Sequence, residues 1–401
     1  MTKRGRVGRE VTAAGVCALV VCVGTAVLRV SASPLPEDYF RYNILKIENT
    51  GPGQFPKVTF SVTNPLNGNT PYNIKTDPPF TATADGSSRL FVQIAWSTSD
   101  YTNKGSGSER AVPPAAAQPI GINALSASVQ NPDLTFTVTS TKPIPTGTTG
   151  SGTVAIEGHP AQDTDGNGTL ERLPVKNVYK HFVITGSTVV NRRQVVDIAK
   201  CQQCHQPHLS LHGNNRTDEP QVCATCHNAN ATDIAYRTSG PETPIDFKYM
   251  VHAIHGTARR TTPFIVIGRN GSVNDFSHVA FPAEPSNCLT CHIDGTFSLP
   301  LGRNVLATTV STGSSYGPNV VKVVDGDPAN DLNITPTAAV CSACHDSAKS
   351  REHMTRTGGA SFSATQAAID SGAVRERCAN CHGVGKDKDV NRVHSIQRDG
   401  D

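Results

Sequence analysis

The segment Cys201-Gln202-Gln203-Cys204-His205 begins the C-x-x-C-H series that decides the fold of the second half of the chain. Two thiols three positions apart can bond the two vinyl groups on one porphyrin edge, and the imidazole that follows then lies under the iron. The pattern occurs five times, so we expect five covalently bound haem c groups. The attachment cysteines are Cys201, Cys204, Cys223, Cys226, Cys288, Cys291, Cys341, Cys344, Cys378 and Cys381, and the proximal ligands are His205, His227, His292, His345 and His382.

Zinc sites or a disulfide framework are the alternative interpretation of paired cysteines. Neither requires a histidine directly after each pair. With 14 His among 401 residues, five such histidines are not expected by chance. The repeated histidine therefore favours haem attachment over zinc or disulfides.

The density of motifs predicts a core built largely from porphyrin. Five haems in about 200 residues is one per roughly 40 residues, and the chain has only 37% hydrophobic and 5% aromatic residues. Apolar porphyrin faces must then supply much of the core, so this part should not fold without haem. Haems packed so closely form a path for electrons.

Each iron also needs a sixth ligand. The segment from Phe247 to Gly256 predicts a short helix that carries His252 and His255. Residues at i and i+3 share one helix face, so these two histidines cannot occupy opposite sides of one iron. We expect them to be distal ligands of two different haems; two solvent-facing histidines are the alternative.

Three more histidines complete the expected distal set. Gly213-Asn214 is a helix stop signal, which predicts that His212 ends a helix beginning at the first motif. His353 and His394 follow the fourth and fifth motifs and are the other two expected ligands. Candidates ranked below these five are His208, His278, Met250 and Met354.

The chain before residue 191 has a different character. No cysteine lies between Tyr42 and Val190, and apolar residues alternate with polar ones in short runs bounded by Pro, Gly and Asn. Such runs predict half-buried antiparallel strands, and hence an all-β split barrel or sandwich over residues 33–190. The clearest runs are 58–62, 90–96, 134–138, 154–156 and 181–184.

Residues 191–401 are expected to form the pentahaem domain, built mostly of short helices and loops around haem. Thr, Ser, Gly, Asn and Asp dominate residues 303–337, which predicts a long loop there. In the β-rich part, Asp163 to Gly168 resembles the first half of a calcium loop. Pro174 stands where a bidentate carboxylate is expected, so a turn is favoured and calcium is the alternative.

Residues 1–32 predict an export signal, because basic residues precede an apolar run that ends near small residues. A membrane anchor is the alternative. Cys17 and Cys22 lie in this run without a convincing lipobox. We expect an exported protein, at the cell surface, outside the cell or in the periplasm.

Cleavage after Ala32 would remove five of 36 basic residues and one of 33 acidic ones. The remaining 31 basic and 32 acidic residues give a net charge of −1, against +3 for the whole chain. The basic balance therefore belongs to the signal, and nothing supports nucleic-acid binding.

From Asn191 to His394 the ordered motifs resemble the OmcA/MtrC family of outer-membrane multihaem cytochromes of metal-reducing bacteria. Besides the five motifs, the matching pieces are Leu211-His212-Gly213, Met250 to Gly256, Val279 to Pro282, Thr335 to Val340, His353-Met354 and Val393-His394. The resemblance implies a split β-barrel joined to a pentahaem domain with bis-His haems. Familiar members are lipoproteins that hold ten haems in two such halves, whereas this sequence shows one half and no recognisable lipobox.

Three classes of function fit these features. One is electron transfer along bis-His haems to extracellular acceptors such as metal oxides, flavins or partner cytochromes, with an outer-membrane electron conduit as a further partner. A second is a multihaem reductase of a small oxyanion, which needs an open iron. All five motifs end in His and distal histidines are in surplus, so electron transfer is favoured over a substrate-specific enzyme. A third is a subunit that self-assembles into extracellular cytochrome filaments.

Overall fold

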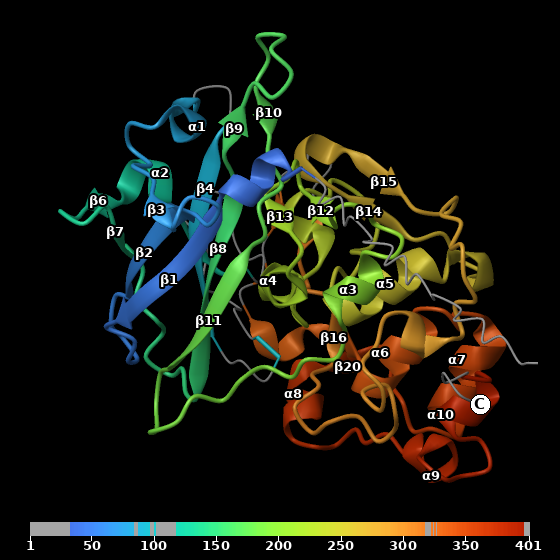
Figure 1. The fold of residues 1–401 in the computed structure, drawn as a ribbon. Coiled ribbons are helices and arrows are strands. Elements are labelled where there is room, and N and C mark those ends of the chain that lie inside the picture. The colour runs from blue at the N-terminus through green and yellow to red at the C-terminus, as the bar shows by residue number, and fades with distance from the viewer. Residues whose placement is uncertain are drawn as a thin grey trace, which may run out of the picture. The chain divides into compact units, whose positions relative to one another are not determined.

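Alternating apolar and polar side chains build two antiparallel sheets in the N-terminal part of the chain (Figure 1). The structure is a computed structural model that describes residues 33–83, 87–96, 100–101, 118–316, 322–323, 325 and 327–396. The expected export signal, with Cys17 and Cys22, lies outside these residues.

The first sheet has the strand order β1-β2-β7-β6, and β3 pairs with β2. The second sheet has the order β11-β8-β4-β5. The first sheet contains β1 (Arg41–Glu48), β2 (Lys57–Asn64), β3 (Thr70–Pro71), β6 (Val129–Gln130) and β7 (Phe136–Thr139). The second contains β4 (Arg89–Trp96), β5 (Ile120–Asn123), β8 (Ser151–His159) and β11 (Val178–Val183). Near them lie β9 (Ala161–Gln162), β10 (Glu171–Arg172), η1 (Pro36–Tyr39), α1 (Pro78–Thr81) and α2 (Ala124–Ala127).

One apolar core lies between the two sheets. Phe60 and Phe136 pair across β2 and β7, and Val92 and Ile156 pair across β4 and β8. All four side chains are fully buried in the same cluster. The expected strand runs therefore form strands, arranged as a sandwich. Among the described residues no ladder closes the two sheets into the barrel that was the other expectation.

Strand β8 departs from the half-buried pattern, because all nine of its residues are buried. One face carries core residues such as Val154. The other side of this sheet meets the motif-bearing part of the chain, where Ala95, Tyr101 and Ala224 form a small buried cluster. Residues Leu35–Asp401 accordingly belong to one compact unit.

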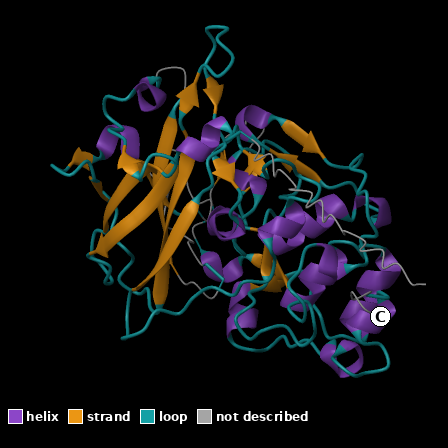
Figure 2. Ribbon diagram, viewed as in Figure 1, coloured by secondary structure: helices purple, strands orange, loops and turns teal. Residues whose placement is uncertain are grey.

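The motif-bearing part consists of short helices and small ribbons beside the sheets (Figure 2). Its helices are α3 (Ile198–Cys201), α4 (Pro220–Cys226), η2 (Asp233–Ala235), α5 (Phe247–His255), η3 (Thr257–Arg259), η4 (Arg269–Gly271), η5 (Cys288–Thr290), η6 (Pro328–Asn330), α6 (Pro336–Ser342), α7 (Ala348–Arg356), α8 (Gln366–Asp370), α9 (Ala379–His382) and α10 (Val390–Val393). Its strands are β12 (Ser210–Leu211), β13 (Arg216–Thr217), β14 (Ile265–Ile267), β15 (Val273–Asp275), β16 (Thr308–Ser311), β17 (Ser315–Tyr316), β18 (Lys322–Val323), β19 (Leu332–Ile334) and β20 (Ala364–Thr365).

Residues 303–337 are not one long loop, which corrects the expectation from composition. Strands β16, β19 and β20 form a three-stranded sheet. Polar residues are buried at its centre: Thr309 Oγ1 donates to Asn333 Oδ1 at 2.9 Å, and both residues are fully buried. A strand whose inward side chains are hydrogen-bonded to each other has no apolar alternation to recognise.

Candidate haem-binding site

Each C-x-x-C-H motif folds into one helical turn. In all five, the backbone N–H of the histidine donates to the carbonyl of the first cysteine, at 2.8 to 3.0 Å. In the second and fourth motifs this turn lies at the end of a helix, α4 or α6. Pro220 and Pro336 occupy first-turn positions of these two helices, where proline is favoured. The shared turn places two thiols and one imidazole in the same local arrangement at every motif.

Every motif histidine faces a second histidine from elsewhere in the chain. The five ring pairs have centroids 5.9 to 6.2 Å apart. They are His205 with His255, His227 with His212, His292 with His252, His345 with His394, and His382 with His353. All five expected distal histidines are among them, each opposite a different motif.

The spacing of these pairs fits a metal ion between two imidazoles. A metal lies about 2 Å from each coordinating ring nitrogen, which gives roughly 6 Å between the ring centroids. Direct stacking of the two rings would bring them closer. The residues present therefore fit five haem irons, each held from both sides by histidine.

Hydrogen bonds at Nδ1 leave the opposite ring nitrogen available. His252 Nδ1 donates to the Lys248 carbonyl at 2.6 Å, and His255 Nδ1 donates to the Val251 carbonyl at 2.9 Å. On the motif side, His227 Nδ1 donates to Ile245 and His382 Nδ1 to Lys388. A carbonyl only accepts, so Nδ1 carries the proton and Nε2 keeps its lone pair for a metal.

Burial keeps several of these imidazoles neutral. It lowers the pKa of His227, His252, His255 and His394, and it lowers the pKa of His292 to about 4. A protonated imidazole has no lone pair to give a metal, so a lowered pKa favours ligation at neutral pH.

The cysteines do not form zinc sites or disulfides in the described residues. No disulfide joins any of the ten motif cysteines. Within the described ranges, Cys and His side chains form no group of three whose ligand atoms lie within 4.8 Å of one another. The zinc interpretation therefore has no support in the geometry.

Helix α5 connects four of the motifs. At its start, Phe247 N donates to the carbonyl of His227 in the second motif at 2.9 Å. It carries His252 and His255, which face the third and first motifs. At its end, a Cβ atom on Gly256 would lie only 2.4 Å from Cys344 Sγ of the fourth motif, so a side chain is not tolerated there.

Further contacts connect the motifs to one another. Lys200 Nζ, beside the first motif, donates to the carbonyl of Leu289 in the third at 2.9 Å. Cys344 Sγ of the fourth motif lies 3.5 Å from the carbonyl of His252, whose ring faces His292 of the third motif. The fourth and fifth motifs exchange partners, because His353 follows the fourth and faces His382 of the fifth. The motifs thus form a connected series from first to third, fourth and fifth, with the second beside α5.

His212 faces a motif histidine, His227, but it lies in a hairpin turn and not at the end of a helix. Helix α3 ends at Cys201, and His212 lies in the turn between β12 and β13 with φ +54°. Pro207 follows the first motif and has no N–H to continue a helix. Gly213 and Asn214 also have φ +67°, so they form a hairpin turn and do not terminate a helix.

The two lower-ranked histidines do not face a motif histidine. His208 lies between two carboxylates, with Nδ1 2.5 Å from Asp218 Oδ2 and Nε2 2.9 Å from Glu37 Oε1. His278 is exposed to solvent.

The acidic loop in the β-rich part brings three carboxylates together. Ligand-capable oxygens of Asp163, Asp165 and Glu171 lie within 4.8 Å of one another. Asp163 Oδ1 already accepts from Gly166 N at 2.7 Å, as in an Asx turn. The sequence interpretation considered Pro174 and missed Glu171, whose carboxylate reaches back to Thr164 N at 2.7 Å.

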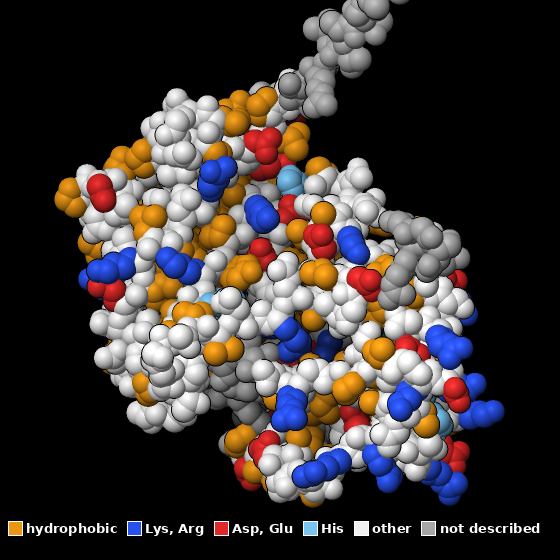
Figure 3. Space-filling view, turned by 60° about the horizontal axis from the view of Figure 1, so that its bottom comes forward, with side chains coloured by type: hydrophobic (Ala, Val, Ile, Leu, Met, Phe, Trp, Pro, Cys, Tyr) orange, Lys and Arg blue, Asp and Glu red, His pale blue; other side chains and the backbone are white. Residues whose placement is uncertain are grey.

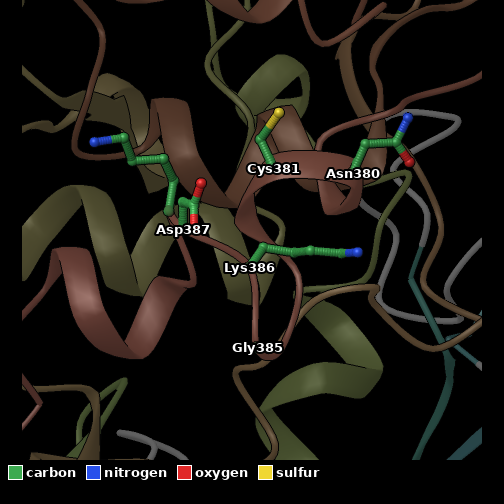
Figure 4. Close-up of a pocket in the computed structure, with 6 residues that line it drawn as sticks. Asn380, Cys381, Gly385, Lys386 and Asp387 are labelled. Carbon is green, nitrogen blue, oxygen red and sulfur yellow. The ribbon is translucent and has the colours of Figure 1, made fainter.

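A hollow of about 330 Å³ lies beside the fifth motif (Figure 4). It is lined by Asn380, Cys381, Gly385, Lys386, Asp387 and Lys388. Cys381 is one of the two exposed motif cysteines. The hollow therefore adjoins the attachment edge of the fifth motif.

In the part of the chain that the structure describes, no helix has the length and apolar character needed to cross a bilayer.

Comparisons with known proteins agree with this arrangement. Residues 193–395 match the family described as outer membrane cytochrome MtrC/MtrF-like, domains II/IV. The crystal structure of MtrC from Shewanella baltica OS185 has a similar fold, with a TM-score of 0.53 and 15% sequence identity. The similarity covers 86% of this chain and 52% of that one, so this chain spans about half the length of that protein. No curated protein sequence matches significantly.

Proposed function

Because the chain belongs to the MtrC/MtrF-like family of outer membrane cytochromes, we propose that it binds five haem c groups covalently and passes electrons between them. The observation that carries the proposal is the set of five histidine pairs at 5.9 to 6.2 Å, one per C-x-x-C-H motif. Haem supplies the one-electron chemistry, because its iron alternates between the ferric and ferrous states.

The protein's own part is to hold each iron from two sides. The proposed metal ligands are the five motif histidines together with His212, His252, His255, His353 and His394. Nδ1 hydrogen bonds to backbone carbonyls fix the ring orientation of His252 and His255, as they do for other metal-bound imidazoles. Fixed ligands reduce the structural change between the two redox states.

Ligation by two imidazoles supports electron transfer over catalysis. A reductase needs an iron with an exchangeable position for its oxyanion, and each motif histidine here has an opposing histidine within 6.2 Å. Two imidazoles also give a lower potential than ligation by methionine. Met250 and Met354, the alternative ligands, pack against the second apolar cluster.

The contacts between motifs support a continuous path. Helix α5 touches the second and fourth motifs and presents histidines to the first and third. The ligand exchange between the fourth and fifth motifs brings the last two haems together. We propose that electrons enter and leave at exposed haems of this series.

The family supports an exported protein at the cell surface. We propose extracellular acceptors such as metal oxides, flavins or partner cytochromes, and an outer-membrane electron conduit as the donor side. The proposed division of the mature chain is a β-rich domain over residues 33–190 and a pentahaem domain over residues 191–401.

Two measurements on the purified holoprotein test the proposal. The intact mass should exceed that of the mature apoprotein by five haem masses, and fewer would show that a motif is vacant. The reduced protein should not bind carbon monoxide under native conditions. Binding at one haem would reveal an open iron and would favour the reductase instead.

A further inference from the structure

The surface around the fifth motif exposes an excess of positive charge. Residues 346–396 have eight exposed cationic side chains and three exposed acidic ones. The cations are Lys349, Arg351, Arg356, Arg375, Arg377, Lys386, Lys388 and Arg392, and the acids are Glu352, Asp370 and Asp387. In Figure 3 the blue side chains gather at the lower right, towards the C-terminal elements. We refer to these eight cations as the basic face.

The other three acidic residues of this segment point inward and are compensated there. Asp346 Oδ2 lies 3.4 Å from Arg260 in a buried ion pair. Glu376 Oε2 accepts from Thr337 N, and its Oε1 accepts from Ala338 N, both at 2.8 Å at the start of α6. Asp389 Oδ2 accepts from Gly385 N at 2.7 Å. The outward charge is therefore positive.

The basic face contrasts with the charge of the whole holoprotein. The mature chain has a net charge of −1 on the cleavage expected above. Each ferric haem adds two propionates and one positive iron core, so five haems bring the total to about −6. One haem lowers the local excess at the basic face by one charge when ferric and by two when ferrous. The basic face therefore stays positive, although the whole protein is negative.

Apolar side chains lie among these cations. Val384 is 66% exposed and Val393 is 48% exposed, and both flank the fifth motif. Figure 4 shows Lys386 and Asp387 on the loop below Cys381, around the hollow described above. An apolar centre with a charged rim is typical of protein interfaces.

We propose that the basic face is a docking surface for an acidic redox protein that exchanges electrons through the fifth haem. The inference rests on the proposed function, because it needs a haem at Cys378 and Cys381. Charge complementarity steers such an encounter and holds the acidic partner near the fifth motif. The fifth motif contacts the fourth through the exchanged histidines, so electrons delivered there can continue along the series.

Small redox ions test the local field first. We would measure oxidation of the reduced holoprotein by ferricyanide and by hexaammineruthenium(III), at low and high ionic strength. Each ferrous haem lacks the positive charge of the ferric iron core, so the net charge of the reduced protein is about −11. That net charge alone predicts that the anionic oxidant is repelled and that its reaction speeds up with salt. The basic face predicts the reverse: ferricyanide should slow with salt, because screening removes a local attraction.

A matched pair of variants then locates the effect. K386E/K388E reverses two cations of the basic face, and K46E/K57E makes the same net change on strands β1 and β2. The first should slow ferricyanide about threefold or more at low salt and accelerate hexaammineruthenium(III), while the second changes both rates much less. Equal effects of the two variants, or no effect of either, would overturn the proposal.

A protein probe completes the test. Reduction of the oxidised holoprotein by an acidic plant-type ferredoxin, a low-potential donor, should slow in K386E/K388E but not in K46E/K57E. If ferricyanide responds and ferredoxin does not, the face attracts small anions only and the docking proposal is wrong. Self-association at low salt that K386E/K388E abolishes would identify a second copy of this chain instead. Haem content and midpoint potentials are measured on every variant, so that failure of haem binding, and with it of the proposed function, is recognised separately.

Discussion

His394 lies opposite His345, with ring centroids 6.1 Å apart and ring planes 22° from parallel, although it follows the fifth motif and His345 belongs to the fourth. The reverse relationship holds for His353, which follows the fourth motif and faces His382 of the fifth at 6.2 Å. Neither pair can form until both segments are in place. The last two haem sites are therefore expected to assemble as one cooperative unit.

Replacing His394 by alanine should open one iron. The haem attached at the fourth motif would keep His345 and lose its second ligand, which gives a high-spin iron that binds carbon monoxide. The four other pairs remain, so the low-spin spectrum should persist with about four-fifths of its intensity. Visible absorption of the reduced protein with and without carbon monoxide measures this.

His278→Ala is the control for that substitution. His278 is exposed and faces none of the motif histidines. This variant should retain the wild-type spectrum and remain inert to carbon monoxide. A carbon monoxide signal in His278→Ala, or none in His394→Ala, would show that the ligand assignment is wrong.

The five pairs fall into two classes by ring orientation, which predicts two kinds of electron paramagnetic resonance signal. The planes are nearly perpendicular in the pairs His205–His255 at 84° and His353–His382 at 83°. In the other three pairs the angles are 9°, 22° and 31°. Perpendicular imidazoles leave two iron d orbitals nearly degenerate, whereas near-parallel imidazoles split them.

The oxidised protein should therefore show three rhombic low-spin haems and two highly anisotropic ones with a single large g value. Spin quantification of the frozen holoprotein at low temperature checks the ratio. Five equivalent rhombic signals would contradict the ring orientations.

The local features of the site could be predicted from sequence, but the pairing could not. The i, i+3 spacing placed His252 and His255 on one face of a predicted helix, and the structure contains this helix as α5. Which motif each histidine faces depends on contacts between residues far apart in the chain, such as Lys200 with Leu289. Spacing along the chain contains no such information.

Two expectations were wrong because local signals were ambiguous. The pair Gly213-Asn214 is typical both of a helix end and of a hairpin turn. Pro207 has no N–H to continue a helix from the first motif, so the hairpin forms. Residues 303–337 looked like a loop because the inward side chains Thr309 and Asn333 are polar and bond to each other. Apolar periodicity cannot detect a strand whose buried face is hydrogen-bonded.

Protonation of His208 should contribute stability at low pH. Burial lowers the pKa of His208, but the Asp218 and Glu37 carboxylates outweigh it and raise the pKa above its ordinary value. A raised pKa in the folded state means that the contribution is fully present below about pH 6.5, the unfolded value, and is lost as pH rises through the folded value.

The holoprotein should therefore lose thermal stability between pH 6 and pH 9, and His208→Gln should lose less over the same interval. His278→Gln, at an exposed position, should follow the wild type. Melting temperatures of the three proteins across this range provide the comparison. A wild-type pH dependence that His208→Gln leaves unchanged would exclude the Glu37–His208–Asp218 contact as its source.

Gly256→Ala should damage the fourth haem site specifically. Gly256 has an ordinary φ of −89°, so alanine suits its backbone, and the obstacle is steric. The new Cβ would lie 2.4 Å from Cys344 Sγ and 2.8 Å from the His252 carbonyl. Overpacking of this kind costs about 1–3 kcal/mol. Because α5 also presents His252 and His255, we expect a lower melting temperature and a fraction of molecules that lack one haem by intact mass.

Gly302→Ala is the matched control, since no atom lies within 4 Å of a Cβ built at Gly302. It should retain five haems and the wild-type melting temperature. If Gly256→Ala carries its full haem content and melts like Gly302→Ala, then α5 can move away from the fourth motif without loss. In that case the close approach of Gly256 to Cys344 is not needed to hold the fourth haem. The inference that α5 connects the fourth motif to the others would then be wrong.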